Sequence, residues 1–159
     1  MKKTAFIIGL LLITTISFAQ RGNQKWYKTA LGLRLEFGAS SDLTGISYEQ
    51  FISNQNSIEF IGLTNFATGA EFTGIYKYIK SLPGIPATVR WYTGIGAHAG
   101  SWQGDKLVVG ADGLLGIGYT FNDIPLNVTL DWHPKINIIT QHDRFIPAIF
   151  GLSFKYVVE

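Results

Sequence analysis

Residues 90–102 read RWYTGIGAHAGSW, and alternate positions along this stretch differ in character. One set is mostly apolar and contains Trp91, Thr93, Ile95, Ala97 and Ala99. The other set mixes polar side chains with glycines and contains Arg90, Tyr92, Gly94, Gly96, His98 and Gly100. A period of two residues is typical of a β-strand. The stretch therefore predicts a strand that separates two unlike environments, one apolar and one polar.

The same alternation recurs along most of the chain after residue 20. It predicts eight strands, at 28–38, 44–52, 58–66, 71–80, 87–100, 107–121, 126–136 and 145–158. Clusters of Gly, Asn, Asp, Ser and Pro separate them, as turns require. An even number of regularly spaced strands, most of them long enough to cross a bilayer, indicates an all-β, eight-stranded antiparallel up-and-down barrel. The facing of the strands at 58–66 and 71–80 is not assigned, because their alternation is less clean.

The apolar rows in the last strands must face either the inside of a soluble, lipocalin-like barrel or a lipid phase. In a membrane barrel the apolar row points outward and the polar row inward. Aromatic residues near the predicted strand ends favour the membrane arrangement, since such rings gather at the two interfaces. They are Trp91, Tyr119, Phe121 and Tyr156 at one end and Trp132 and Trp102 at the other. The sequence thus predicts a transmembrane barrel, with the soluble barrel as the alternative.

In the membrane arrangement a polar cluster fills the interior. Its predicted members are Arg34, Glu36, Glu49, Arg90, His98, Asp112, Asp131, His133 and Lys155. Acidic and basic members nearly balance, as charges enclosed in a narrow barrel must. An eight-stranded barrel is just wide enough for side chains to fill it, so no open pore is expected. Glycines on the polar face of the strands would leave room for the long side chains.

The N-terminus predicts export. Lys2 and Lys3 precede the apolar run AFIIGLLLITTISF, and Ser17-Phe18-Ala19 supplies a small-x-small cleavage site. Residues 1–19 are therefore interpreted as a signal peptide and 20–159 as the barrel domain, with an uncleaved anchor as the alternative. Removing Lys2 and Lys3 from the 13 basic residues leaves 11, against 11 acidic residues, and the chain has no Cys. This balance argues against nucleic-acid binding.

Two further stretches carry a resemblance to a known family. RWYTGIGAHAG and VGADGLLGIGYTFNDIPLNVTLDWHPKINI, together covering most of 90–138, resemble a family of small gram-negative outer-membrane β-barrel proteins whose function is largely unassigned. The resemblance implies location in the outer membrane, contact with its lipid, and insertion by the outer-membrane assembly machinery. One departure is the C-terminus: such barrels commonly end in an aromatic residue, whereas this chain ends KYVVE.

The function expected is an integral outer-membrane protein with a structural or envelope-related role, monomeric, with no catalytic residue, metal or cofactor. One alternative is a lipid-modifying enzyme, in which His133 pairs with Asp131, or His98 activates Ser101 as a nucleophile. A metal site from His98, Asp112 and His133 is a second alternative, although no ligand motif supports it. Passage of a small solute, or partner binding through the loops, completes the alternatives.

Overall fold

The computed structural model describes residues 27–38, 42–102, 106–139 and 144–158, and it contains only strands and turns in these ranges. The strands are β1 (Thr29–Gly38), β2 (Leu43–Phe51), β3 (Asn56–Thr64), β4 (Gly69–Ser81), β5 (Val89–Trp102), β6 (Lys106–Thr120), β7 (Leu126–Trp132), β8 (Lys135–Ile139), β9 (Phe145–Ile146) and β10 (Ile149–Val158). No helix in the described ranges is long and apolar enough to cross a membrane. The predicted signal peptide at 1–19 lies outside the described residues.

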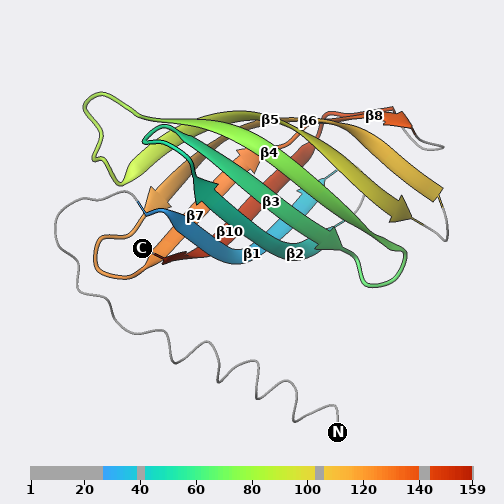
Figure 1. The fold of residues 1–159 in the computed structure, drawn as a ribbon, viewed down its shortest axis with the longest axis horizontal. Coiled ribbons are helices and arrows are strands. Elements are labelled where there is room, and N and C mark those ends of the chain that lie inside the picture. Colours follow the sequence, from blue (N-terminus) through green and yellow to red (C-terminus); the bar gives the residue numbers. More distant parts are fainter. Residues whose placement is uncertain (1–26, 39–41, 103–105, 140–143, 159) are drawn as a thin grey trace, which may run out of the picture.

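The strands close into a barrel by antiparallel pairing of neighbours in the chain (Figure 1). The pairing runs from β1 through β6, continues to β7 and β8, and returns from β10 to β1, with Thr29 opposite Val158. β7 and β8 occupy one position in the wall, and β9 and β10 occupy the next. The ten strands therefore make eight wall positions, which confirms the predicted eight-stranded antiparallel barrel. Closure leaves every wall strand paired on both sides along most of its length.

The predicted strands at 126–136 and 145–158 are each interrupted, and proline explains both breaks. A proline has no N–H to donate to a neighbouring strand. Pro134 separates β7 from β8, and Pro147 separates β9 from β10. The backbone bonds around the breaks are kept by Gly113 N–H donating to the Pro134 carbonyl and His133 N–H donating to the Ile149 carbonyl, both at 2.9 Å. The wall thus remains closed despite the interruptions.

The outer face of the barrel is apolar between its two ends. Ile95 is 74% exposed and Ile138 is 70% exposed, and many other large apolar side chains lie on the same face. Among the described residues, the exposed charged side chains all lie at strand ends or in turns: Lys28, Asp42, Lys80, Asp123 and Arg144. Five outward tyrosines lie in the half of the barrel that contains the first residue of β1 and the last of β10: Tyr48, Tyr76, Tyr78, Tyr119 and Tyr156. We call this half the terminal end, and the other the opposite end.

The inner face holds a small apolar core beside a much larger polar one. Ile61 and Leu63 of β3, Ile75 and Ile79 of β4, and neighbouring apolar side chains pack together inside the wall. These strands therefore carry apolar residues on both faces. This settles the facing that the sequence left unassigned: the odd-numbered residues 57–63 and 71–79 point inward.

Trp132 supplies a hydrogen bond at the strand break that Pro147 causes. The outward-facing Trp132 indole donates from Nε1 to the Pro147 carbonyl at 2.5 Å. A carbonyl left without a donor at a strand break would be costly in an apolar surrounding. The indole therefore supplies the bond that strand pairing does not.

We expect Trp132→Phe to lower the free energy of unfolding by about 1 kcal/mol, because the carbonyl loses its donor while an aromatic ring stays in place. Urea titration of the protein folded in lipid vesicles measures this quantity. Trp91→Phe, which makes the same change on the outer face near the terminal end, serves as the control. Equal losses in the two variants would contradict a capping role for Trp132.

Candidate functional site

The interior is filled by two connected clusters of buried charged side chains, to which every wall position contributes at least one group. The first, here the Lys–Glu cluster, consists of Glu49 of β2, Glu59 of β3, Lys77 of β4 and Lys155 of β10. The second, here the histidine cluster, consists of Arg34, Glu36, Glu71, His98, Asp112, Asp131, His133 and Lys135. All twelve side chains are buried.

In the Lys–Glu cluster each lysine contacts both glutamates. Lys77 Nζ lies 2.8 Å from Glu49 Oε1 and 2.8 Å from Glu59 Oε2. Lys155 Nζ lies 2.7 Å from Glu49 Oε2 and 2.7 Å from Glu59 Oε1. All four carboxylate oxygens are thus engaged, and the cluster is electrically neutral. Such complete pairing is what allows charges to remain buried.

Tyr92 connects the two clusters. Lys77 Nζ lies 4.2 Å from the centre of the Tyr92 ring, a cation–π contact. The Tyr92 hydroxyl donates to Asp131 Oδ2 at 2.8 Å. Arg34 then holds the same carboxylate in a bidentate pair, with Nη2 to Oδ1 at 2.7 Å and Nη1 to Oδ2 at 3.0 Å. The planar fork of arginine suits this two-point contact.

The histidines continue the network toward the opposite end. Arg34 Nε donates to Glu36 Oε1 at 3.0 Å, and His133 Nδ1 lies 2.6 Å from the same oxygen. His133 Nε2 lies 3.0 Å from Asp112 Oδ1, and His98 Nδ1 lies 3.0 Å from Asp112 Oδ2. Lys135 Nζ bridges Glu36 Oε2 at 3.0 Å and Glu71 Oε1 at 2.5 Å.

Both ring nitrogens of His133 face carboxylate oxygens, which accept hydrogen bonds and have none to donate when ionised. Glu36 is ionised because it also accepts from Arg34 and Lys135. His133 therefore carries two protons and a positive charge. His98 is placed similarly, with Nδ1 toward Asp112 and Nε2 2.9 Å from the Asn137 side-chain oxygen. Its geometry likewise favours the doubly protonated ring.

The charges of the buried residues then balance. The buried carboxylates are Glu36, Glu49, Glu59, Glu71, Asp112 and Asp131. The permanently charged buried cations are Arg34, Lys77, Lys135 and Lys155. Six carboxylates against four such cations leave an excess of two negative charges. Two protonated histidines neutralise it, which gives these rings an electrostatic role in holding the interior together.

Among the nine residues assigned to the interior from sequence, eight are buried within the two clusters. The ninth, Arg90, is half-buried near the terminal end and belongs to neither cluster. Sequence reasoning missed Glu59, Glu71, Lys77 and Lys135. Lys135 continues the inward alternation of Asp131 and His133, so its position could have been extrapolated. The other three lie on strands whose facing was unassigned, although a charge in the middle of a membrane strand itself indicates the inner face.

The residue pairs that the sequence suggested for catalysis do not contact each other as that role requires, because each member binds other partners or faces another side of the wall. Asp131 binds Arg34 and Tyr92, whereas His133 binds Glu36 and Asp112. Ser101 is exposed on the wall, while His98, three residues earlier, is buried inside. The described residues contain no group of three or more His, Asp or Glu side chains arranged to hold a metal ion.

Inward glycines make room for the charged groups. An added Cβ at Gly151 would lie 2.2 Å from Arg34 Nη2 and 2.5 Å from Asp131 Oδ1. At Gly116 it would lie 2.6 Å from the Tyr92 hydroxyl oxygen. The absence of a side chain at these positions is thus a condition for the Arg34–Asp131 pair and its contact with Tyr92.

Comparison with solved structures gives distant similarity. No protein-family model matches the chain, and no curated protein matches its sequence. Among solved structures, the crystal structure of Neisserial surface protein A (NspA) is similar over 80% of this chain and 92% of that chain, with 15% sequence identity and a TM-score of 0.45. A similarity of this degree does not identify a function.

We expect Gly151→Ala to destabilise the barrel by about 3 kcal/mol, because the methyl group displaces one member of a buried, hydrogen-bonded ion pair. Gly62→Ala is the matched control, since a Cβ at this outward strand glycine would meet only Ile46 Cγ1, at 3.9 Å. Urea unfolding in vesicles compares the two variants. If Gly151→Ala unfolds at the wild-type midpoint, the close packing around Arg34 is wrong.

We also expect stability to fall as pH rises above about 6.5, the ordinary pKa of imidazole, because the surrounding carboxylates favour the protonated rings of His98 and His133 in the folded barrel. Deprotonation of His98 and His133 would leave two buried carboxylates uncompensated and cost about 3 kcal/mol. Unfolding titrations at each pH would show this loss in the wild type. His133→Gln should show a weaker pH dependence, whereas His142→Gln, which changes the third histidine of the sequence, should retain the wild-type dependence. An unchanged dependence in His133→Gln would exclude His133 as the group responsible.

Proposed function

We propose that this chain is an integral outer-membrane β-barrel protein, exported by its N-terminal signal peptide, with a structural or envelope-related role and a closed lumen. The observation that carries the proposal is the inverted distribution of side chains. Large apolar side chains cover the outer face between the ends, while twelve charged or histidine side chains fill the inside. Lipid solvates such an outer surface, and water does not.

The distribution of tyrosines supports the same proposal. The five outward tyrosines all lie in the terminal half of the wall, where a membrane interface would meet a ring with a polar tip. Trp91 joins them, in edge-on contact with Tyr78. Trp102, which the sequence predicts at the other interface, instead shares the inward face of β5 with Tyr92 and His98 and packs against the inner apolar core. The outer face thus has an apolar band with tyrosines and Trp91 toward its terminal edge.

The interior network supports a closed lumen. The Lys–Glu cluster joins β2, β3 and β4 to β10 across the inside of the barrel. The Arg34–Asp131 and Lys135–Glu71 pairs cross it at other positions. An ion entering the lumen would have to separate these pairs in a low-dielectric interior. We therefore infer that the barrel spans the membrane with a closed lumen and no open channel.

Planar-bilayer recording tests the closed lumen. The wild type should show no steady conductance. Replacing Glu49, Glu59, Lys77 and Lys155 together by Ser keeps the net charge and removes side-chain volume, so this variant should conduct. The control replaces the glutamates by Gln and the lysines by Met, which also keeps the net charge but retains the volume, and should stay closed. Steady channels in the wild type would refute the proposal, and fractionation with outer membranes tests the location separately.

A further inference from the structure

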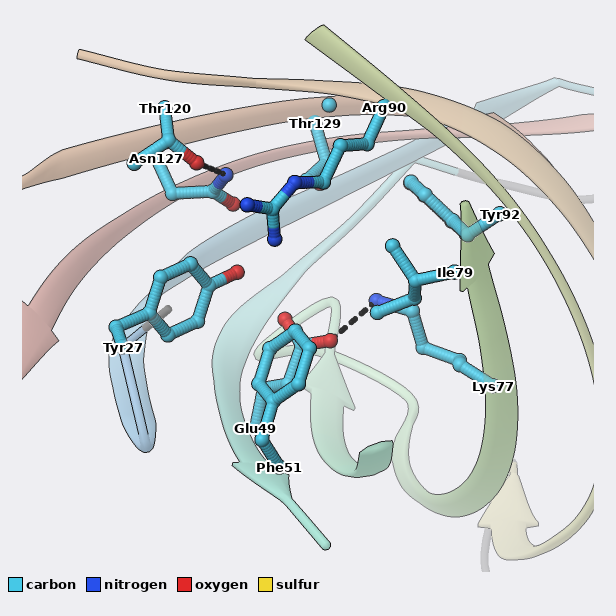
Figure 2. A pocket seen from close by; sticks show the side chains of 11 residues that line it. Tyr27, Glu49, Phe51, Lys77, Ile79, Arg90, Tyr92, Thr120, Asn127 and Thr129 are labelled. Carbon is cyan, nitrogen blue, oxygen red and sulfur yellow. Dashed lines mark hydrogen bonds and ion pairs between the residues drawn. The ribbon is translucent and has the colours of Figure 1, made fainter. Parts of the chain in front are cut away.

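The terminal end of the barrel contains a small cavity that neither cluster fills (Figure 2). Arg90, Asn127 and Thr129 line one side, and Tyr27 and Glu49 lie across from them. The cavity measures about 20 Å³, which is room for one water-sized group. It lies beyond the Lys–Glu cluster, on the side of the barrel where the chain enters β1.

Two buried atoms at this cavity make no hydrogen bond of ordinary geometry in the described structure, although the threonine among them interacts with the Tyr92 hydroxyl. They are Asn127 Oδ1 and Thr129 Oγ1, and each residue is 4% exposed. The Asn127 amide is oriented by its nitrogen, which donates to Thr120 Oγ1 at 2.9 Å. Its oxygen is therefore left for the cavity. Buried polar atoms without partners are rare in proteins, and an unobserved bound group is one of their ordinary explanations.

The electrostatics of the lining select the kind of group. A cation is disfavoured by Arg90 and Lys77, which both line the cavity. An anion is disfavoured by Glu49 and by the acceptor oxygen of Asn127. The phenol of Tyr27 adds no charge, because burial, and then the negative charges of Glu49 and Glu59, raise its pKa well above the usual range. A neutral group that both donates and accepts fits these neighbours, and a hydroxyl has this property at the required size.

We propose that the terminal-end cavity is a binding site for one neutral hydroxyl group, which donates to Asn127 Oδ1 and bonds to Thr129 Oγ1. A water molecule can supply this group, and so can a hydroxyl of a small polyol or sugar entering from the terminal end. The chemistry of recognition is the same in both cases. Glu49 and Lys77 of the Lys–Glu cluster line the cavity, whereas the hydroxyl bonds to Asn127 and Thr129, which belong to neither cluster.

NMR of the full chain refolded in detergent micelles tests the site directly. Cross-relaxation between water and the Thr129 methyl or Asn127 side-chain amide would identify bound water. Saturable shifts of the same signals on titration with glycerol or methyl α-glucoside, absent in Thr129→Val, would identify a solute hydroxyl. Either result supports the proposal.

The second measurement is whether Thr129→Val raises or lowers the stability of the barrel against unfolding. A hydroxyl bound to Thr129 makes Thr129→Val destabilising, because a hydrogen bond is lost. An empty cavity makes the same change stabilising, because an unpaired buried oxygen is removed. Thr44→Val, on the outer face of β2, reports the effect of the same substitution away from the cavity. A higher unfolding midpoint in Thr129→Val than in the wild type, with no water or solute signal at the site, would overturn the proposal.

Discussion

A charge that cannot reach water must lie close to an opposite charge, and the interior of this barrel is organised by that requirement. The apolar outer face leaves the inside as the place for ionisable side chains between the two ends. Once there, each carboxylate of the Lys–Glu cluster meets two lysines, and each lysine meets two carboxylates. Removing any one partner would leave a buried charge uncompensated, which is far more costly than the pair is favourable.

The same requirement explains why small residues matter as much as charged ones. The Arg34 guanidinium reaches Asp131 only because Gly151 has no side chain. His98 lies similarly against Gly110, where an added Cβ would come within 2.5 Å of the ring. Glycine weakens a strand taken alone. In this barrel the loss is offset by the ion pairs that the free volume admits.

Much of this architecture could be predicted from alternation along the chain. In β5, β6 and β7 one face is apolar and the other polar, so strand position and facing both follow from the period of two. The prediction was incomplete in β3 and β4, because Ile61, Leu63, Ile75 and Ile79 point inward and make both faces partly apolar. Glu59 and Lys77 were missed there for that reason, and with them half of the Lys–Glu cluster.

The partners of each charge could not be predicted, for a different physical reason. A sequence pattern assigns a residue to one face of a strand, whereas the pairing of buried charges depends on strand register and on the order of strands around the wall. Arg34 and Asp131 are far apart in the chain and meet because β10 lies between β1 and β7. The strand breaks at Pro134 and Pro147 could have been anticipated from the prolines themselves. The Trp132 contact that accompanies them requires the register.

The Lys–Glu cluster also bears on how the chain can be assembled. Glu49, Glu59 and Lys77 come from three consecutive strands that pair with one another, and together they carry one excess negative charge. Lys155, which neutralises it, lies in the last strand of the chain. The ion pair between Arg34 of the first strand and Asp131 likewise cannot form until β7 is in place. A partly formed wall is therefore electrostatically incomplete, and the arrival of the final strand joins the edges of the sheet and balances the charge in one event.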